Sequence, residues 1–169
     1  RPVGHPINAR YPWRLASNLG NHFGVIYANE NRALLEEFQR MADPALGIYA
    51  ASVFPSLGIN SVFVGGDDIE LPPDGGARQV FGDFCVLKTG DVRQPSDLMV
   101  FASARGPFEG RIVQGYYKVT PPFLMARRWS VAWNPEDGPE AWGNVHPRFS
   151  NKGVVGMVDG HVESLDRAG

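Results

Sequence analysis

Histidines and carboxylates gather near the end of the chain, in the segment 144–166, NVHPRFSNKGVVGMVDGHVESLD. Five of its side chains carry groups that bind zinc or transfer protons in enzymes: His146, Asp159, His161, Glu163 and Asp166. In a strand, His161 and Glu163 would point to the same side, as two ligands of one metal ion do. A zinc site needs three or four convergent donors, however, and a His-x-Glu pair supplies only two. The spacing favours an architectural role, with a metal site or a small hydrolase using Asp159 and His161 as the alternatives.

A hairpin turn accounts for the same residues without any chemistry. Asp159-Gly160 lies between two apolar runs, 154–158 and 161–165. Asp-Gly is a common pair in two-residue turns of type I′, because both central residues of that turn need positive φ. The sequence therefore predicts a β-hairpin with Asp159 and Gly160 at its tip.

A second group of carboxylates lies in the polar loop 65–76, GGDDIELPPDGG. Calcium takes about six to eight oxygen ligands, and this loop contains Asp67, Asp68, Glu70 and Asp74. Its prolines and its spacing do not match the calcium-binding loop of a helix-loop-helix site. A solvated turn is the favoured interpretation, and a calcium site is the alternative.

Cys85 is the only cysteine, and it lies in the apolar run 79–87, QVFGDFCVL. Such a run predicts a strand in which the thiol is a small buried hydrophobe. The alternative, a nucleophilic thiol, requires a partner histidine, and none of the four histidines lies at a spacing that identifies one. The sequence also contains no nucleotide-binding glycine motif and no Gly-x-Ser-x-Gly elbow. We therefore predict no cofactor and no catalytic residue.

Aromatic residues are concentrated between positions 108 and 149. Trp129, Trp133 and Trp142 belong to this group. Such side chains form hydrophobic cores, sugar-binding platforms or protein contact surfaces. The sequence places most of them in the core, but this region is the best candidate for an interface, with the three tryptophans as its candidate residues.

The composition indicates one globular domain over residues 1–169. The 16 basic and 18 acidic residues are well mixed and give a net charge of −2, so the chain lacks the basic surface that binds nucleic acid. No apolar run reaches the length of about 18 residues that spans a membrane. The 20 glycines and 14 prolines are dispersed and predict many turns, as in antiparallel β structure.

The expected helices lie in the first third of the chain, to about residue 55. Pro12 suits the first turn of a short helix that ends near Leu19-Gly20. Apolar residues at helical spacing predict a second helix over about 29–43. The segment 43–54 fits either a third helix, capped by Asp43, or a strand.

From about residue 56 to 169 the chain is predicted to be β-rich. The expected strands are 58–66, 79–87, 97–104, 111–122, 127–133 and the two arms of the terminal hairpin. Helices followed by strands predict an α+β fold in which an antiparallel sheet packs against the N-terminal helices.

The terminal segment resembles the C-terminal signature of prepilin-like proteins of the H-X9-DG type, a family related to pseudopilins. In that signature a histidine precedes Asp-Gly by nine residues. Asp159-Gly160-His161 matches, but Phe149 stands at the histidine position, and the nearest histidine is His146. Because phenylalanine can pack but cannot bind a metal or transfer a proton, this departure favours a structural role. YPWRL, PSLGINSVFVGG and PSDLMVFASA extend the resemblance more weakly over most of the chain.

The resemblance implies a non-enzymatic, exported structural subunit of a pilus-like or pseudopilus-like filament, located outside the cell or on its surface. Its partners would be other copies of itself and other pilin-like subunits. In this family an N-terminal hydrophobic helix provides the membrane contact. That helix is absent from this chain, so we expect the chain to be the headpiece, a sheet packed on a helix. The alternative is a surface-exposed module that binds carbohydrate or calcium.

Overall fold

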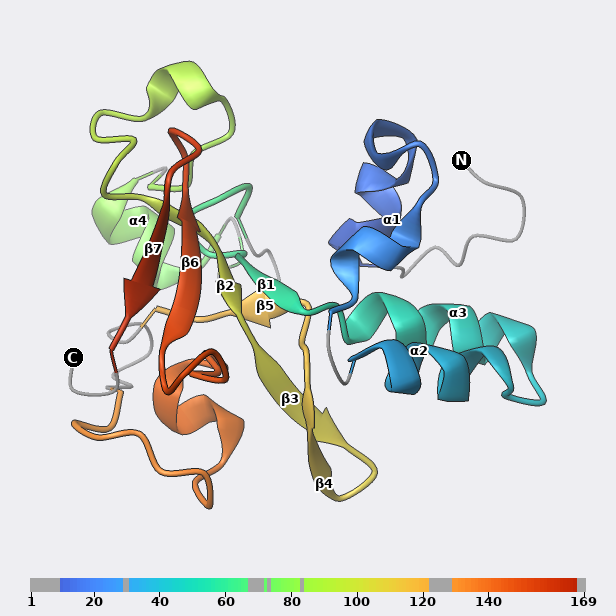
Figure 1. The fold of residues 1–169 in the computed structure, drawn as a ribbon. Coiled ribbons are helices and arrows are strands. Elements are labelled where there is room, and N and C mark those ends of the chain that lie inside the picture. The colour runs from blue at the N-terminus through green and yellow to red at the C-terminus, as the bar shows by residue number, and fades with distance from the viewer. Residues whose placement is uncertain are drawn as a thin grey trace.

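The computed structural model describes residues 10–28, 31–66, 72, 74–82, 84–121 and 129–166. It contains four α-helices, α1 (Tyr11–Leu15), α2 (Asn31–Gln39), α3 (Pro44–Val53) and α4 (Gly76–Phe81). The strands are β1 (Leu57–Asn60), β2 (Met99–Ser103), β3 (Arg105–Phe108), β4 (Arg111–Gln114), β5 (Lys118–Val119), β6 (Gly153–Met157) and β7 (Val162–Leu165). Helices and a mainly antiparallel sheet occur together, in agreement with the predicted α+β class (Figure 1).

The helices α1 and α3 begin where Pro12 and the pair Asp43-Pro44 predict. Pro12 lies in the first turn of α1, and a 3₁₀ turn continues to Leu19 before Gly20 ends it with a φ of 58°. The Asp43 side chain accepts hydrogen bonds from the backbone N–H groups of Ala45 and Leu46, at 2.9 and 3.3 Å. The helix interpretation of the segment 43–54 is thus confirmed, and the strand alternative is wrong.

The five-stranded sheet has the order β5-β1-β2-β6-β7. The pairs β1–β2, β2–β6 and β6–β7 are antiparallel, as predicted, whereas β1 and β5 are parallel. The core under this sheet is formed by Ala102, Ala104, Val119, Trp142, Val145 and Val155.

The helices α2 and α3 pack against a separate two-stranded sheet, β3–β4. The chain passes directly from β2 through Ala104 into β3, so that one continuous run of extended residues serves both sheets. Leu34 and Phe38 of α2 pack with α3 residues and with Phe108 and Val113 of the β3–β4 hairpin. Figure 1 shows α2 and α3 beside this hairpin, to one side of the five-stranded sheet. The helices α2 and α3 thus pack against an antiparallel sheet, as predicted, but this sheet is the separate β3–β4 hairpin and not the five-stranded one.

Several strand predictions are also wrong. In the run 79–87, residues 79–81 belong to α4, and among the described residues of this run only Val86 makes a bridge, with Val64. Within 129–133 no strand forms, and the side chain of Val131 is 94% exposed. The predicted strand 111–122 is divided by Gly115, which has a φ of 92°. Apolar runs of strand length predicted these strands, but glycine conformation and tertiary contacts decide whether such a run pairs.

Among the described residues, no helix has the length and apolar character needed to cross a membrane.

Candidate functional site

The C-terminal motif contains two tight turns in succession. Phe149 and Lys152 exchange backbone hydrogen bonds of 3.1 and 3.0 Å across Ser150 and Asn151. Ser150 and Asn151 have φ values of 51° and 66°. Positive φ at both central residues is the requirement of a type I′ turn. This geometry was predicted at Asp159-Gly160, and the structure places it earlier in the chain, at Ser150-Asn151.

The predicted hairpin is confirmed, but its turn is of a different type. β6 pairs with β7 from Gly153 opposite Leu165 to Gly156 opposite Val162. At the tip, Gly160 N donates to Met157 O at 3.1 Å and Met157 N donates to His161 O at 3.0 Å. Only Gly160 has positive φ, at 93°, in this three-residue loop. This is a type I turn followed by a glycine bulge, and it makes Gly160 the residue that a side chain would strain.

Asp159, His161 and Glu163 come together at this tip. The His161 Nδ1 atom lies 2.6 Å from Asp159 Oδ1, and Nε2 lies 3.0 Å from Glu163 Oε1. The backbone N–H of His161 donates to the same Asp159 oxygen at 3.1 Å. Both ring nitrogens therefore face carboxylates, which is the arrangement of an imidazolium between two anions.

This arrangement changes the pKa values in opposite directions. Hydrogen bonds to Glu163 and then to Asp159 raise the pKa of His161 above its ordinary value. The backbone N–H of His161, together with its side chain, lowers the pKa of Asp159. All three groups are in contact with solvent, so salt weakens the attraction.

We expect an NMR titration to give His161 a pKa above about 6.5. Because the folded pKa is raised, the contribution of this group to stability is complete below the unfolded pKa and is lost as the pH rises through the folded pKa. Glu163→Gln should lower the pKa of His161, because the hydrogen bond to a charged carboxylate is lost. Glu136→Gln, an exposed carboxylate in another loop, is the control. An identical His161 pKa in all three proteins would contradict the geometry.

The remaining members of the predicted cluster lie elsewhere. Asp166 forms an ion pair with Lys152, with a distance of 3.1 Å between Oδ1 and Nζ. The imidazole of His146 stacks on Trp133, with ring centroids 6.2 Å apart. Within the described residues, no three His, Cys, Asp or Glu side chains are arranged to hold a metal ion.

Arg148, next to the signature position, has a structural role that sequence reasoning missed. Its guanidinium donates to the carbonyl oxygens of Ser56 and Ala104, at 2.6 and 3.2 Å, and lies 5.2 Å from the ring centroid of Phe149. Ser103 fixes the same segment, because its buried hydroxyl donates to His146 O and accepts from Val154 N. The motif around Phe149 is thus held to the sheet by side-chain to backbone bonds.

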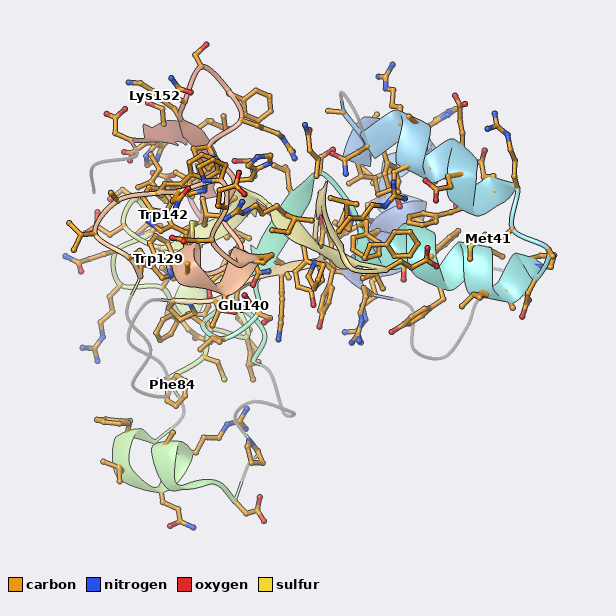
Figure 2. All side chains as sticks on the ribbon, turned by 90° about the horizontal axis from the view of Figure 1, so that it is seen from below. Met41, Phe84, Trp129, Glu140, Trp142 and Lys152 are labelled. Atoms are coloured by element: carbon orange, nitrogen blue, oxygen red, sulfur yellow. The ribbon has the colours of Figure 1, made fainter. Side chains whose placement is uncertain are left out.

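The candidate interface tryptophans all have contacts within the chain. Trp142 is 3% exposed and belongs to the core, so its prediction as an interface residue is wrong. Trp129 stacks on it at 5.9 Å, and Figure 2 shows the two rings next to each other. Trp133 lies between His146 and the Arg105 guanidinium, which is 5.1 Å from its ring centroid. Trp129 and Trp133 are half-buried and keep part of their surface in contact with solvent.

The two remaining candidates from the sequence are the acidic loop 65–76 and Cys85. Asp67, Asp68 and Glu70 of the acidic loop lie outside the described residues, and Asp74 is exposed. Cys85 is a half-buried free thiol beside Gly66, rather than the fully buried strand residue that was predicted.

Comparisons of the chain with protein-family models, with curated proteins and with solved structures found no match.

Proposed function

We propose that this chain is a non-enzymatic structural subunit, with a pilin-headpiece-like fold, of an exported pilus-like or pseudopilus-like filament. The observation that carries the proposal is that the residues of the C-terminal signature form turns and packing contacts within the chain. Asp159 and Gly160 form a hairpin tip, the His161 ring is bound on both sides by carboxylates, and Phe149 packs against Arg148. The resemblance to the H-X9-DG family supports the filament role.

The exposed apolar surface supports contact between copies of the chain. Val80 and Phe81 of α4 are 73% and 74% exposed, and Figure 2 shows α4 standing away from the rest of the described chain. A groove of about 500 Å³ lies beside β6 and the segment 86–92. Its walls are mainly apolar: Val64, Val86, Leu87, Val92, Val100, Phe101 and Met157.

A projecting apolar helix and an apolar groove on one chain can join head to tail. Contacts between two different surfaces produce open helical assemblies when the rotation does not close, which is the geometry of a filament. In this proposal the α4 residues Val80 and Phe81 of one subunit occupy the groove of the next.

The proposal predicts concentration-dependent self-association of the purified chain, measured by sedimentation velocity. Phe81→Glu should prevent it by placing a charge on the projecting helix, and Leu87→Glu should prevent it by placing a charge in the groove. Leu87 is 74% exposed, as is Phe81, so neither change disturbs the core. Val131→Glu is the matched control, because Val131 is exposed and lies outside both surfaces.

Mixing the two variants distinguishes a contact between helix and groove from a contact between two like surfaces, and growth of the wild-type chain beyond a dimer shows that the contact does not close. The Phe81→Glu chain retains its groove and the Leu87→Glu chain retains its helix, so together they should form a 1:1 complex that grows no further. A wild-type chain that stays monomeric at high concentration would contradict the proposal. So would variants that associate as well as the wild type.

A further inference from the structure

A small pocket beside the tryptophan pair has features of a ligand site. It has a volume of about 190 Å³ and lies between β5, the 3₁₀ turn Pro139–Trp142 and the end of the β3–β4 sheet. Its walls include the aromatic side chains of Tyr116 and Trp129 and the polar side chains of Lys118, Thr120, Glu140 and Asn144. Figure 2 shows Glu140 beside Trp129. The volume is below the range of about 300–1,000 Å³ that is typical of drug-sized ligands, so a single small ring is the appropriate occupant.

The aromatic wall is held in a fixed orientation. Trp129 Nε1 donates to Thr120 O at 3.2 Å, and the indole stacks on buried Trp142 with an interplanar angle of 20°. Trp142 Nε1 in turn donates to Ser130 O at 2.9 Å. Gly143 permits this packing, because a Cβ there would lie 2.1 Å from Thr120 O and 2.4 Å from Trp129 Nε1. A preorganised aromatic surface lowers the entropic cost of binding.

The polar wall combines one cation with one anion. Lys118 Nζ, which lies 5.9 Å from the ring centroid of Tyr117, can donate hydrogen bonds, and the Glu140 carboxylate can accept them. A neutral ligand whose hydroxyl groups both donate and accept hydrogen bonds can use both side chains. A cationic ligand would be repelled by Lys118, and an anionic ligand would be repelled by Glu140. Together with an apolar ring face for Trp129 or Tyr116, these requirements describe a pyranose sugar.

We propose that this pocket binds one neutral sugar ring, as the terminal unit of a glycan or as a free monosaccharide. The sugar's apolar face stacks on the aromatic wall, and its hydroxyls bind Lys118 and Glu140. This inference is independent of filament assembly, since the pocket shares no residue with α4 or with the apolar groove.

The test follows the Trp129 indole N–H signal by NMR during titration of the full chain with glucose, galactose, mannose and N-acetylglucosamine. We expect at least one of them to shift this signal with a Kd in the millimolar range, about 1–10 mM. Glu140→Gln and Lys118→Met should each weaken binding about tenfold, which corresponds to the loss of one hydrogen bond to a charged group. Both residues line the pocket. The dispersion of the backbone amide signals shows whether each variant is folded.

Glu136→Gln is the matched control, since Glu136 lies in the neighbouring loop but not in the pocket wall, and it should bind as the wild type does. The inference is overturned if none of the four sugars shifts the Trp129 signal at about ten times the expected Kd. It is also overturned if Glu136→Gln weakens binding as much as Glu140→Gln.

Discussion

Gly115→Ala is expected to lower the free energy of unfolding at 25 °C by more than about 4 kcal/mol. Losses of this size are exceptional for one substitution and amount to a large part of the stability of an ordinary domain. The measurement is urea unfolding followed by far-UV circular dichroism.

Two independent features of Gly115 cause this effect. Its φ of 92° lies in the left-handed region, which costs energy for any residue with a Cβ. The added Cβ would also lie 2.1 Å from Asn31 Nδ2, 2.6 Å from Phe54 O and 2.7 Å from Pro55 O. Two of these atoms belong to the backbone, and Asn31 is completely buried, so none of the three can move aside without disturbing the core.

Asn31 explains why this position cannot relax. Its Nδ2 donates to the carbonyl oxygens of Phe54 and Gln114, and its Oδ1 accepts from the Ser56 hydroxyl at 3.1 Å. A displaced Asn31 leaves buried carbonyls without a partner, and each such group costs about 1–3 kcal/mol.

Gly156→Ala is the matched control. Gly156 lies in β6, no heavy atom lies within 4 Å of the position that an added Cβ would occupy, and its φ is not positive. We expect this variant to unfold within about 1 kcal/mol of the wild type. If Gly115→Ala and Gly156→Ala unfold at the same urea concentration, the close approach of Asn31 to Gly115 is wrong.

The helices α1, α2 and α3 could be predicted from the sequence because their determinants are local, whereas α4 lies where a strand was predicted. Asp43 and Pro44 start α3 by a cap and a fixed φ, and the spacing of Leu34 and Phe38 identifies the buried face of α2. The strands were predicted less well, because an apolar run pairs only if a partner strand exists. In the run around Cys85, the described residues form a single bridge, between Val86 and Val64.

In the candidate site, local reasoning located the hairpin and the face shared by His161 and Glu163, but not the type of turn. Asp-Gly fits both a type I′ turn and a type I turn with a glycine bulge, so composition alone does not decide between them. Arg148 could not be assigned a role from the sequence, because its partners Ser56 and Ala104 lie 92 and 44 residues away. The type and position of one arginine do not identify hydrogen-bond acceptors that lie so far away in the sequence.

Arg148→Ala should lower the free energy of unfolding by roughly 2–4 kcal/mol, since two hydrogen bonds from a charged donor to buried carbonyls are lost. Ser56 is 4% exposed and Ala104 is completely buried, so water does not readily replace the guanidinium there. Arg148→Lys should recover only part of the loss, because an ammonium group does not reproduce the planar fork that reaches both oxygens. Urea unfolding of the three proteins measures both differences.

Arg40→Ala is the control for removing an arginine. Arg40 forms an exposed pair with Glu36 at 3.2 Å, and such pairs contribute less than about 1 kcal/mol. Equal stability losses in Arg148→Ala and Arg40→Ala would contradict the structural role of Arg148.

Ser56 links Arg148 to the network around Gly115. Its carbonyl accepts from Arg148 and from Ala104 N, its hydroxyl bonds with Asn31, and the Ala104 carbonyl accepts from Gly115 N at 2.7 Å. Asn31→Ala and Arg148→Ala should therefore be non-additive, with a coupling of at least about 0.5 kcal/mol in a double-mutant cycle. Such a coupling would mean that Arg148 helps to stabilise the junction of the helices with both sheets. Strict additivity would mean that Arg148 stabilises only its own loop.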